Sequence, residues 1–407
     1  MTQPLLQAAD LRGAARLTTE AVAGLAGLVE AVHARVITAP AIAGLGGGGA
    51  APERTGGLTG LIYGTVRGVT QLVGASAEAL LGGLAPLLTG PDVREPPRPE
   101  REAVLAALNG VLGDHLAAGD NPLAIEMAFR HGGRPLVLER GALRARLPGA
   151  TRRILVLVHG LCMNDLQWQR GGHDHGEALA RAAGWTPVYL HYNSGLSVST
   201  NGRILARLME RLYDAWPMPV ERLAMVGHSM GGLVARSAIH HGLQIQRGGL
   251  RWPPRVTELV CLGTPHLGAP LERAGHGIDQ LLGAAPYAAP LARLGTLRSA
   301  GIKDLRYGNI VVGAPSDDAT RSQPPVALPD GVRCFAVAAS RGAASGRAPD
   351  ALPGDGLVPV ASALGRHPDP ACGLAFDPEH QAVVHDTGHL DLLSSAPAFD
   401  LLQRWLA

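Results

Sequence analysis

The sequence has little of what marks exported, membrane-spanning or nucleic-acid-binding proteins. Its four cysteines lie far apart, without a Cys-x-x-Cys pair or a dense framework, which favours a reducing compartment. The formal net charge is only +2, so no basic excess favours a nucleic-acid partner. No uncharged run approaches the ~20 apolar residues of a membrane-spanning helix, and the first residues lack the basic start of a signal peptide. We therefore expect a cytoplasmic protein, at most peripheral to a membrane.

What is present is enough apolar sequence for a large core and an appendage. Because 407 residues exceed the size at which one core usually stops growing, we expect two parts. Residues 1–90 are predicted to form a helical extension, with helices over 5–36 and 57–89. The apolar face of the second helix either packs on the protein's own body or contacts a membrane or partner. Residues 91–100 are charged and rich in proline, which predicts an exposed linker, and 101–407 form the second domain.

The second domain shows the alternation of an α/β fold. Residues 101–118 predict a helix, and 123–138 predict a β-hairpin around a Gly-Gly turn. Short β-rich runs then alternate with helical stretches, which predicts a mostly parallel sheet with helices on both faces. These runs are Ile154–Val158, Pro187–Leu190, Leu223–Val226, Val256–Leu262 and Val332–Val337. The stretch 265–330 is too long for a simple crossover, so we expect it to carry cap or lid helices.

A nucleophile is predicted at Ser229, in the Gly-His-Ser-Met-Gly run 227–231. A buried strand precedes this run and a helix follows it, so Ser229 lies on the turn that joins them. In a G-x-S-x-G turn, Gly227 and Gly231 leave room for a strained backbone that holds the hydroxyl above the sheet. In parallel sheets, ligands bind beyond the carboxyl ends of the strands, where this turn lies. The pattern therefore predicts nucleophilic catalysis by Ser229.

An oxyanion hole is predicted from an upstream loop. The strand Ile154–Val158 runs into His159-Gly160-Leu161, about 70 residues before the serine. Acyl transfer requires two amide donors, one from the residue after the nucleophile and one from such a loop. We assign Met230 and Leu161. Gly160 allows the backbone to approach the reacting carbonyl, whereas His159 and His228 are expected to support the loop and the turn.

A serine hydroxyl requires a histidine base that follows both the serine and the acid in this type of sheet. His389 lies on a Gly-bearing loop between an apolar run and the C-terminal helix, so we favour it over His385. His367 and His380 lie in proline-flanked polar segments and are expected at the surface. The base is therefore predicted at His389.

The acid is predicted at Asp355, in Pro-Gly-Asp-Gly-Leu-Val-Pro after the last predicted strand. Its carboxylate would orient the imidazole of His389, and the flanking glycines suit a turn that directs it inward. Asp304 and Asp279 are rivals. We expect Asp304 to form a structural ion pair with an Arg or Lys instead.

Together, four motifs resemble those of the bacterial triacylglycerol lipases and the related GPI-inositol-deacylase-like hydrolases. The resemblance covers roughly residues 150 to 395 and is carried by Val158–Leu161, Gly227–Gly232, Leu262–Gly268, and Asp355–Pro359 with Gly388-His389. It implies an α/β-hydrolase fold and hydrolysis of carboxylic esters, including lipid esters, through an acyl-enzyme on a triad of Ser229, Asp355 and His389.

Two other functions remain open on the sequence. A thioesterase or acyltransferase could use the same triad, because an acyl-enzyme can be released to water, an alcohol or an amine. A catalytically silent binding protein on the same fold is the third reading, because a fold does not fix function. No cofactor or metal is assigned. The run 173–175, His-Asp-His, could bind a metal, but we expect it to be a solvated helix start.

Overall fold

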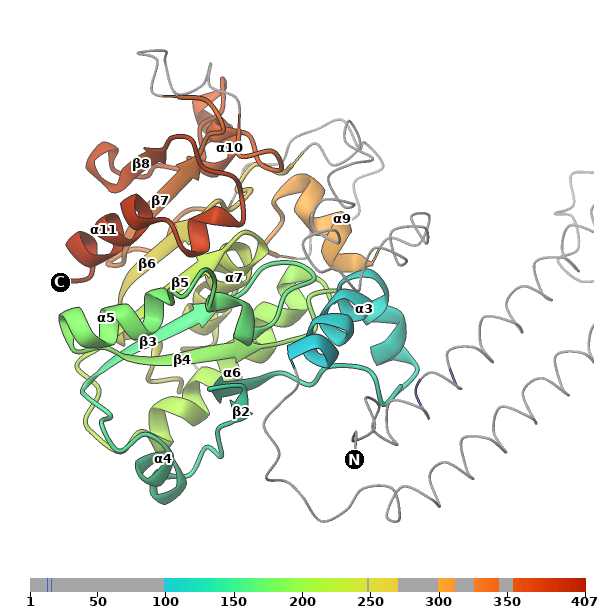
Figure 1. The fold of residues 1–407 in the computed structure, drawn as a ribbon, viewed down its shortest axis with the longest axis vertical. Helices are drawn as coiled ribbons and strands as arrows, with labels where there is room; N and C mark the ends of the chain where they lie inside the picture. The colour runs from blue at the N-terminus through green and yellow to red at the C-terminus, as the bar shows by residue number, and fades with distance from the viewer. Residues whose placement is uncertain are drawn as a thin grey trace, which may run out of the picture. The chain divides into compact units, whose positions relative to one another are not determined.

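The computed structural model describes residues 13, 16, 99–246, 249–269, 299–311, 326–343 and 354–407 (Figure 1). The chain divides into two compact units, one of residues 1–95 and 116–124, the other of 96–115 and 125–407. In the first unit, Asn121 Nδ2 donates to Gly13 O at 3.1 Å and Arg16 Nη1 donates to Asp120 O at 3.4 Å. Apart from residues 13 and 16, the helices predicted over 5–36 and 57–89 lie outside the described residues, as does most of the predicted linker.

The second unit is built on one sheet, whose described strands follow the order β2-β1-β4-β3-β5-β6-β7-β8. Strands β3 to β8 pair in parallel, while β1 runs antiparallel to both β2 and β4. The strands are β1 Ala128–His131, β2 Arg134–Pro135, β3 Arg153–Val158, β4 Thr186–His191, β5 Arg222–His228, β6 Val256–Leu262, β7 Arg333–Ala339 and β8 Gln381–Val384. The carboxyl ends of the parallel strands therefore meet at one edge.

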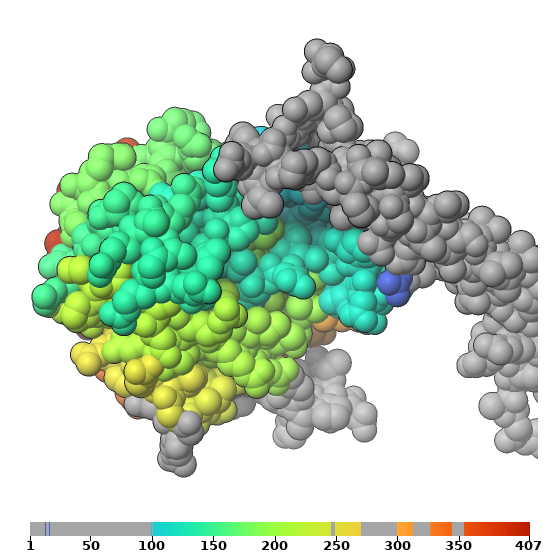
Figure 2. Space-filling model, turned by 90° about the horizontal axis from the view of Figure 1, so that it is seen from below, coloured from blue at the N-terminus to red at the C-terminus, as the bar shows by residue number. Residues whose placement is uncertain are grey.

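Helices cover both faces of this sheet. The α-helices are α3 Pro99–Ala118, α4 Arg140–Arg146, α5 His175–Ala183, α6 Val198–Ala215, α7 Met230–Gln246, α9 Ala300–Tyr307, α10 Val360–Ala363 and α11 Ala396–Trp405. The 3-10 helices are η1 Asp165–Trp168, η2 Pro253–Arg255, η5 Pro370–Cys372, η6 Pro378–His380 and η7 Asp391–Leu393. Helices α5 and α11 lie on one face, and α6 and α7 on the other (Figure 1). Figure 2 shows the side on which α4 lies beside α6, where Arg140 Nη2 donates to Asp214 O at 3.4 Å.

The central strands are apolar over most of their length because both of their faces are covered. Leu155 and Leu157 of β3 point to the side of α5 and α11, where they join a core cluster with Trp168 and Leu402. The alternate residues of β3 point to the other side, and all of its residues from Ile154 onward are buried. Continuous runs of this kind are typical of parallel sheets.

The structure confirms all five predicted strands and the predicted mostly parallel sheet with helices on both faces. The helix predicted over 101–118 is confirmed as α3, which starts two residues earlier, at Pro99, a position that tolerates proline. The hairpin is shorter than predicted. Ile125 N–H donates to Asn109 Oδ1 at 2.9 Å instead of to a neighbouring strand, so β1 begins only at Ala128.

Helix α9 lies within the stretch for which a cap or lid is predicted. Gly301 N donates to Gly195 O at 3.0 Å and Ala269 N donates to Leu305 O at 3.1 Å, so α9 is fastened to the body of the unit. Much of the remainder of 265–330 lies outside the described residues, and the lid stays a prediction. Over the part of the chain that is described, no helix has the length and hydropathy needed to cross a bilayer.

Candidate active site

Ser229 lies on the sharp turn between β5 and α7. Its φ is +54°, a left-handed conformation that costs energy in a non-glycine residue and is characteristic of strained functional turns. The turn is held on both sides, because Ser229 N donates to Leu262 O at 2.8 Å and Gly232 N donates to Ser229 O at 3.1 Å. The strain is therefore maintained by the neighbouring strand β6 and by the first turn of α7.

The two glycines that flank Ser229 are required by close backbone contacts. A Cβ on Gly231 would lie 2.1 Å from Val158 O, and one on Gly227 would lie 2.4 Å from the backbone of Gly232. No side chain fits in such a space, whatever its chemistry. The turn can thus pack directly on the end of β3, which brings it beside the loop that follows β3.

That loop approaches the serine at Gly160. A Cβ on Gly160 would lie 3.1 Å from Ser229 Cβ, so the backbone of the loop is in contact with the serine side chain. Neither the Leu161 amide nor the Met230 amide donates to an acceptor among the described residues. Met230 is also the first residue of α7, where the helix dipole favours negative charge. These two amides are the donors predicted for an oxyanion.

His159 is buried behind this loop. Burial lowers the pKa of His159 to about 3, so its imidazole is neutral at ordinary pH. Its ring stacks on Tyr192 with 4.3 Å between centroids, its Nδ1 donates to Gly160 O at 2.9 Å, and Tyr192 Oη donates to His159 O at 2.9 Å. The side chain therefore fixes the loop, as expected from the sequence.

Asp355 and His389 are brought together although 34 positions separate them in the chain. His389 Nδ1 donates to Asp355 Oδ2 at 2.7 Å, and both side chains are buried. The other carboxylate oxygen accepts from Leu357 N at 2.9 Å and Val358 N at 2.8 Å. Burial alone would raise the pKa of Asp355, but the nearby His389 and these hydrogen bonds outweigh it and hold the pKa below its usual value. Asp355 is therefore ionised and fixed.

His228 connects the serine turn to the loop that carries His389. Its Nε2 donates to His389 O at 3.0 Å, and the two rings lie 4.8 Å apart between centroids. Burial lowers the pKa of His228 to about 3, so the ring is neutral and carries its proton on Nε2. The sequence predicted a support for the turn but did not reveal this partner. Within the described residues, His389 Nε2 has no hydrogen-bond partner, which leaves this atom available to accept a proton.

The rival histidines have other contacts. His385 Nδ1 lies 3.4 Å from Gly342 O, and His367 Nδ1 accepts from Asp369 N at 3.0 Å. The ring of His380 packs on Phe335 with 4.2 Å between centroids. None of these side chains contacts Asp355 in the part of the chain that the structure describes.

Asp304, the other candidate acid, contacts the start of α6. Its Oδ2 accepts a hydrogen bond from Val198 N at 2.8 Å, and no ion pair with an Arg or Lys is found for it within the described residues. Burial raises the pKa of Asp304. The other rival, Asp279, lies outside the described residues.

The run 173–175 starts a helix, as expected, but the prediction that this start is solvated is wrong for His175, which is fully buried. Asp174 is the N-cap of α5, and its Oδ1 accepts from Glu177 N at 3.0 Å and from Tyr189 Oη at 2.7 Å. His173 Nε2 and His175 Nδ1 share a hydrogen bond of 2.8 Å, and His175 Nε2 donates to Leu392 O at 2.8 Å. These side chains are thus occupied by contacts within the protein.

A small cleft of about 70 Å³ lies between the loop after β3 and the loop after His389. It is lined by Cys162, Met163, Gln167, Gln169, Arg170, Leu390 and Leu393. Because its walls include the residues next to Leu161 and next to His389, it borders the candidate oxyanion donor and the candidate base.

Comparisons with known proteins concern the same part of the chain. Residues 150–283 match the family model described as the PGAP1-like alpha/beta domain. Among solved structures, the mature lipase BlEst2 of Bacillus licheniformis is 18% identical, with a TM-score of 0.40, over 63% of this chain and 92% of that chain. The esterase PF2001 of Pyrococcus furiosus is 13% identical, with a TM-score of 0.36, over 64% of this chain and 84% of that chain. The search of curated proteins gives no match.

The sheet order and the strand–turn–helix that carries Ser229 agree with the fold predicted from the sequence. The second unit therefore has the α/β-hydrolase fold, and its stretch from residue 150 to 283, which includes Ser229, matches the PGAP1-like alpha/beta domain.

Proposed function

We propose that this protein is a serine hydrolase that cleaves carboxylic esters through Ser229, His389 and Asp355. One observation carries the proposal. Ser229 is held at φ +54° beside two amides that have no acceptor among the described residues, and the buried pair of His389 and Asp355 presents an Nε2 that has no hydrogen-bond partner there. A nucleophile, an oriented base and oxyanion donors are the three parts that acyl transfer requires.

In the proposed mechanism, the Ser229 hydroxyl oxygen attacks the ester carbonyl carbon while His389 Nε2 takes the hydroxyl proton. The carbonyl oxygen becomes an oxyanion that accepts from the Leu161 and Met230 amides. His389 then gives the proton to the leaving alcohol, and the carbon–oxygen bond to the alcohol breaks, which leaves an acyl-enzyme. Water repeats the sequence with His389 as the base, which releases the carboxylic acid and the free serine. Asp355 orients the imidazole and stabilises its cationic form throughout.

The direct test is labelling of the full chain by a fluorophosphonate probe, compared between the wild type and Ser229→Ala. We expect one labelled serine in the wild type and none in the variant. Hydrolysis of p-nitrophenyl esters should fall by about 10⁴-fold or more in the variant, since loss of the nucleophile leaves only binding and oxyanion stabilisation. A wild-type protein that is neither labelled nor active would refute the proposal and favour a binding role.

The same assay separates the possible substrates and acceptors. A rate that rises with acyl-chain length supports the proposed lipid esters, whereas a preference for short chains supports an esterase of small substrates. Thioester substrates test the thioesterase reading. Added alcohol or amine tests acyl transfer, because a transferase would convert the acyl-enzyme to a new ester or amide faster than water hydrolyses it.

A further inference from the structure

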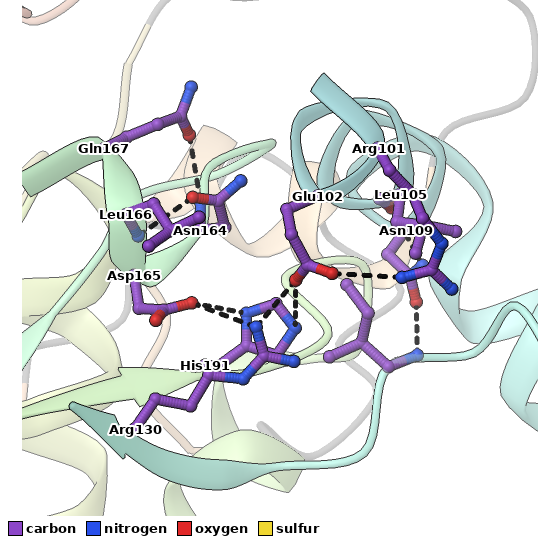
Figure 3. Close-up of polar contacts among 11 residues, drawn as sticks. Arg101, Glu102, Leu105, Asn109, Arg130, Asn164, Asp165, Leu166, Gln167 and His191 are labelled. Carbon is purple, nitrogen blue, oxygen red and sulfur yellow. Dashed lines mark hydrogen bonds and ion pairs between the residues drawn. The ribbon is translucent and has the colours of Figure 1, made fainter. Parts of the chain in front are cut away.

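Three buried ionisable side chains, Glu102, Asp165 and His191, form a cluster with Arg130, whose side chain is 15% exposed (Figure 3). Arg130 Nη1 lies 2.6 Å from Glu102 Oε2 and 3.3 Å from Asp165 Oδ1. His191 Nδ1 lies 3.2 Å from Asp165 Oδ1, and its Nε2 lies 3.8 Å from Glu102 Oε2. The four come from α3, β1, η1 and the end of β4, and Arg101 Nη1 donates to the second oxygen of Glu102 at 3.0 Å.

Electrostatic attraction holds the cluster together, because a buried charge without a partner of opposite sign is costly. The side chains of Glu102, Asp165 and His191 are each at most 6% exposed. A buried carboxylate without a cation is strongly unfavourable, so the two carboxylates require the guanidinium between them. Burial alone would raise the pKa of Asp165, but His191 and Arg130 outweigh it, and the pKa lies below its usual value.

Glu102, Asp165 and His191 also form a set of metal-ligand types, with their donor atoms within 4.8 Å of one another. The position of Arg130 argues against a metal ion in this set. Its guanidinium already supplies a positive charge to both carboxylates, and a divalent cation placed among them would be repelled by it. We therefore interpret the cluster as an ionic network without a metal.

The network fixes one end of the candidate oxyanion loop. The loop 159–164 leaves β3 and ends where Asp165 begins η1. The end of β4 and the segment after it hold both the loop and the start of η1. His191 of β4 contacts Asp165, while Tyr192 Oη donates to His159 O and Cys162 N donates to Ser194 Oγ at 3.0 Å. Leu161 lies between these contacts. A shift of Asp165 would therefore be transmitted to the Leu161 amide.

We propose that Glu102, Arg130 and His191 are positioning residues that hold Asp165, and through it the Leu161 amide, at the place of the oxyanion. The inference rests on the proposed function and extends it to α3, a helix that precedes the sheet in the chain and contributes no group to the reaction itself. The network acts on the transition state, because an amide misplaced by a fraction of an ångström still permits substrate binding but stabilises an oxyanion less.

The test uses Arg130 in the full chain. Arg130→Met leaves both carboxylates without their shared cation, and we expect kcat to fall by roughly ten- to hundredfold with KM changed by less than about threefold, since removal of one oxyanion donor typically costs 10²–10³. Arg130→Lys should recover most of kcat, because a single nitrogen of Arg130 makes both contacts and an ammonium can replace it. His191→Gln, which keeps Arg130 against both carboxylates, should give a smaller loss and serves if Arg130→Met does not fold.

A second readout identifies the oxyanion hole. Thionoesters place sulfur, a weaker acceptor, where the oxyanion forms, so an intact hole favours the ester over the matched thionoester. We expect this preference to shrink in Arg130→Met by about the same factor as kcat, and to return in Arg130→Lys. A role confined to folding would lower the amount of active enzyme without changing this ratio.

The matched control is Glu221→Gln, which also breaks a carboxylate–arginine pair, with Arg152, but at a position where both side chains are more than half exposed. It should leave kcat and the preference unchanged. If Arg130→Met has the ester preference of this control, the inference is wrong. If the wild type itself is inactive and unlabelled, the proposed function fails instead. Stoichiometric binding of Zn²⁺ or Ca²⁺ to the wild type that is lost in Asp165→Asn would overturn the ionic network in favour of a metal site.

Discussion

The Asp355 carboxylate accepts one hydrogen bond from the His389 imidazole and two from backbone amides. In Asp355→Asn the backbone contacts can persist, but the new amide can present an N–H toward Nδ1. The imidazole would then carry its proton on Nε2, where it cannot act as a base toward Ser229. We expect kcat for p-nitrophenyl esters to fall by about 10³–10⁴-fold with little change in KM.

Asp304→Asn is the matched control, because Asp304 is a half-buried carboxylate that precedes His389 in the chain but binds the start of α6. It should keep kcat within a few-fold of the wild type. Full turnover by Asp355→Asn, or a large loss in Asp304→Asn, would show that the acid has been assigned to the wrong residue.

The residues proposed to react could be selected from the sequence because each one carries a local signature. Ser229 lies in a five-residue motif, and Asp355 and His389 lie on Gly-bearing loops after predicted strands. Residues such as Glu102 and Arg130 could not be found in this way. Their partners come from four separated segments, and a buried Glu or Arg looks like a surface residue in the sequence until the fold brings its counter-charge to it.

At the scale of secondary structure elements, the contact between the serine turn and β3 has little tolerance. A methyl group on Gly231 would lie 2.1 Å from Val158 O, so the turn or β3 must move to admit it. We expect Gly231→Ala to lower the free energy of unfolding by about 3 kcal/mol or more, at the upper end of what overpacking costs. Urea denaturation followed by fluorescence provides the measurement.

Gly141→Ala is the corresponding control, because a Cβ at Gly141 in the exposed helix α4 meets nothing within 4 Å. There the substitution should be neutral or stabilise by up to about 1 kcal/mol, since alanine favours helix. Equal effects of the two substitutions would contradict the tight contact between the turn and β3.

A buried carboxylate lies near the amino ends of the parallel strands, at the end of the sheet opposite to Ser229. Glu258 in β6 is 1% exposed and lies 2.5 Å from Arg222 of β5 and 2.5 Å from Arg333 of β7. Glu258→Gln leaves two arginines without their counter-charge, but both remain partly exposed, so we expect a loss of only about 1–3 kcal/mol in the free energy of unfolding. Because this end of the strands lies away from Ser229, kcat per folded molecule should be unchanged, and a fall in kcat would contradict that separation.

The strands of the sheet were the most predictable elements. Apolar runs covered on both faces are long and continuous, as in β3, and they leave little ambiguity. Boundaries set by side chains were less predictable. The hairpin strand was expected to include Ile125. Instead, the backbone N–H of Ile125 donates to the side-chain oxygen of Asn109, 16 residues earlier. No local sequence pattern reveals such a contact.

At the scale of the whole molecule, three buried histidines make stability depend on pH. Burial lowers the pKa of His159 and of His228 to about 3 and that of His175 to about 4. In the unfolded chain these groups titrate near 6.5, so the unfolded state binds more protons between these values. Stability is therefore complete above pH 6.5 and is lost as the pH falls toward 3. At pH 5 each histidine should lower the free energy of unfolding by about 2 kcal/mol.

Tryptophan fluorescence reports on this effect in the second unit, because all five tryptophans of the chain lie there. The difference in unfolding free energy between pH 7.5 and pH 5 should shrink by about 2 kcal/mol in His175→Gln, which can still donate to Leu392 O but does not titrate. An unchanged difference would mean that His175 is not buried in its neutral form.

The short strands at the two ends of the sheet have a consequence for behaviour at high concentration. On one side the sheet ends in β2, which has two residues, one of them a proline without an N–H to donate, and on the other side it ends in the four-residue β8. A long, flat border would allow a second chain to add a strand and begin a fibril. Here an incoming strand would find few backbone partners at either border. Among the described residues, the sheet is thus closed to growth by strand addition, which favours a second unit that resists fibril formation when concentrated.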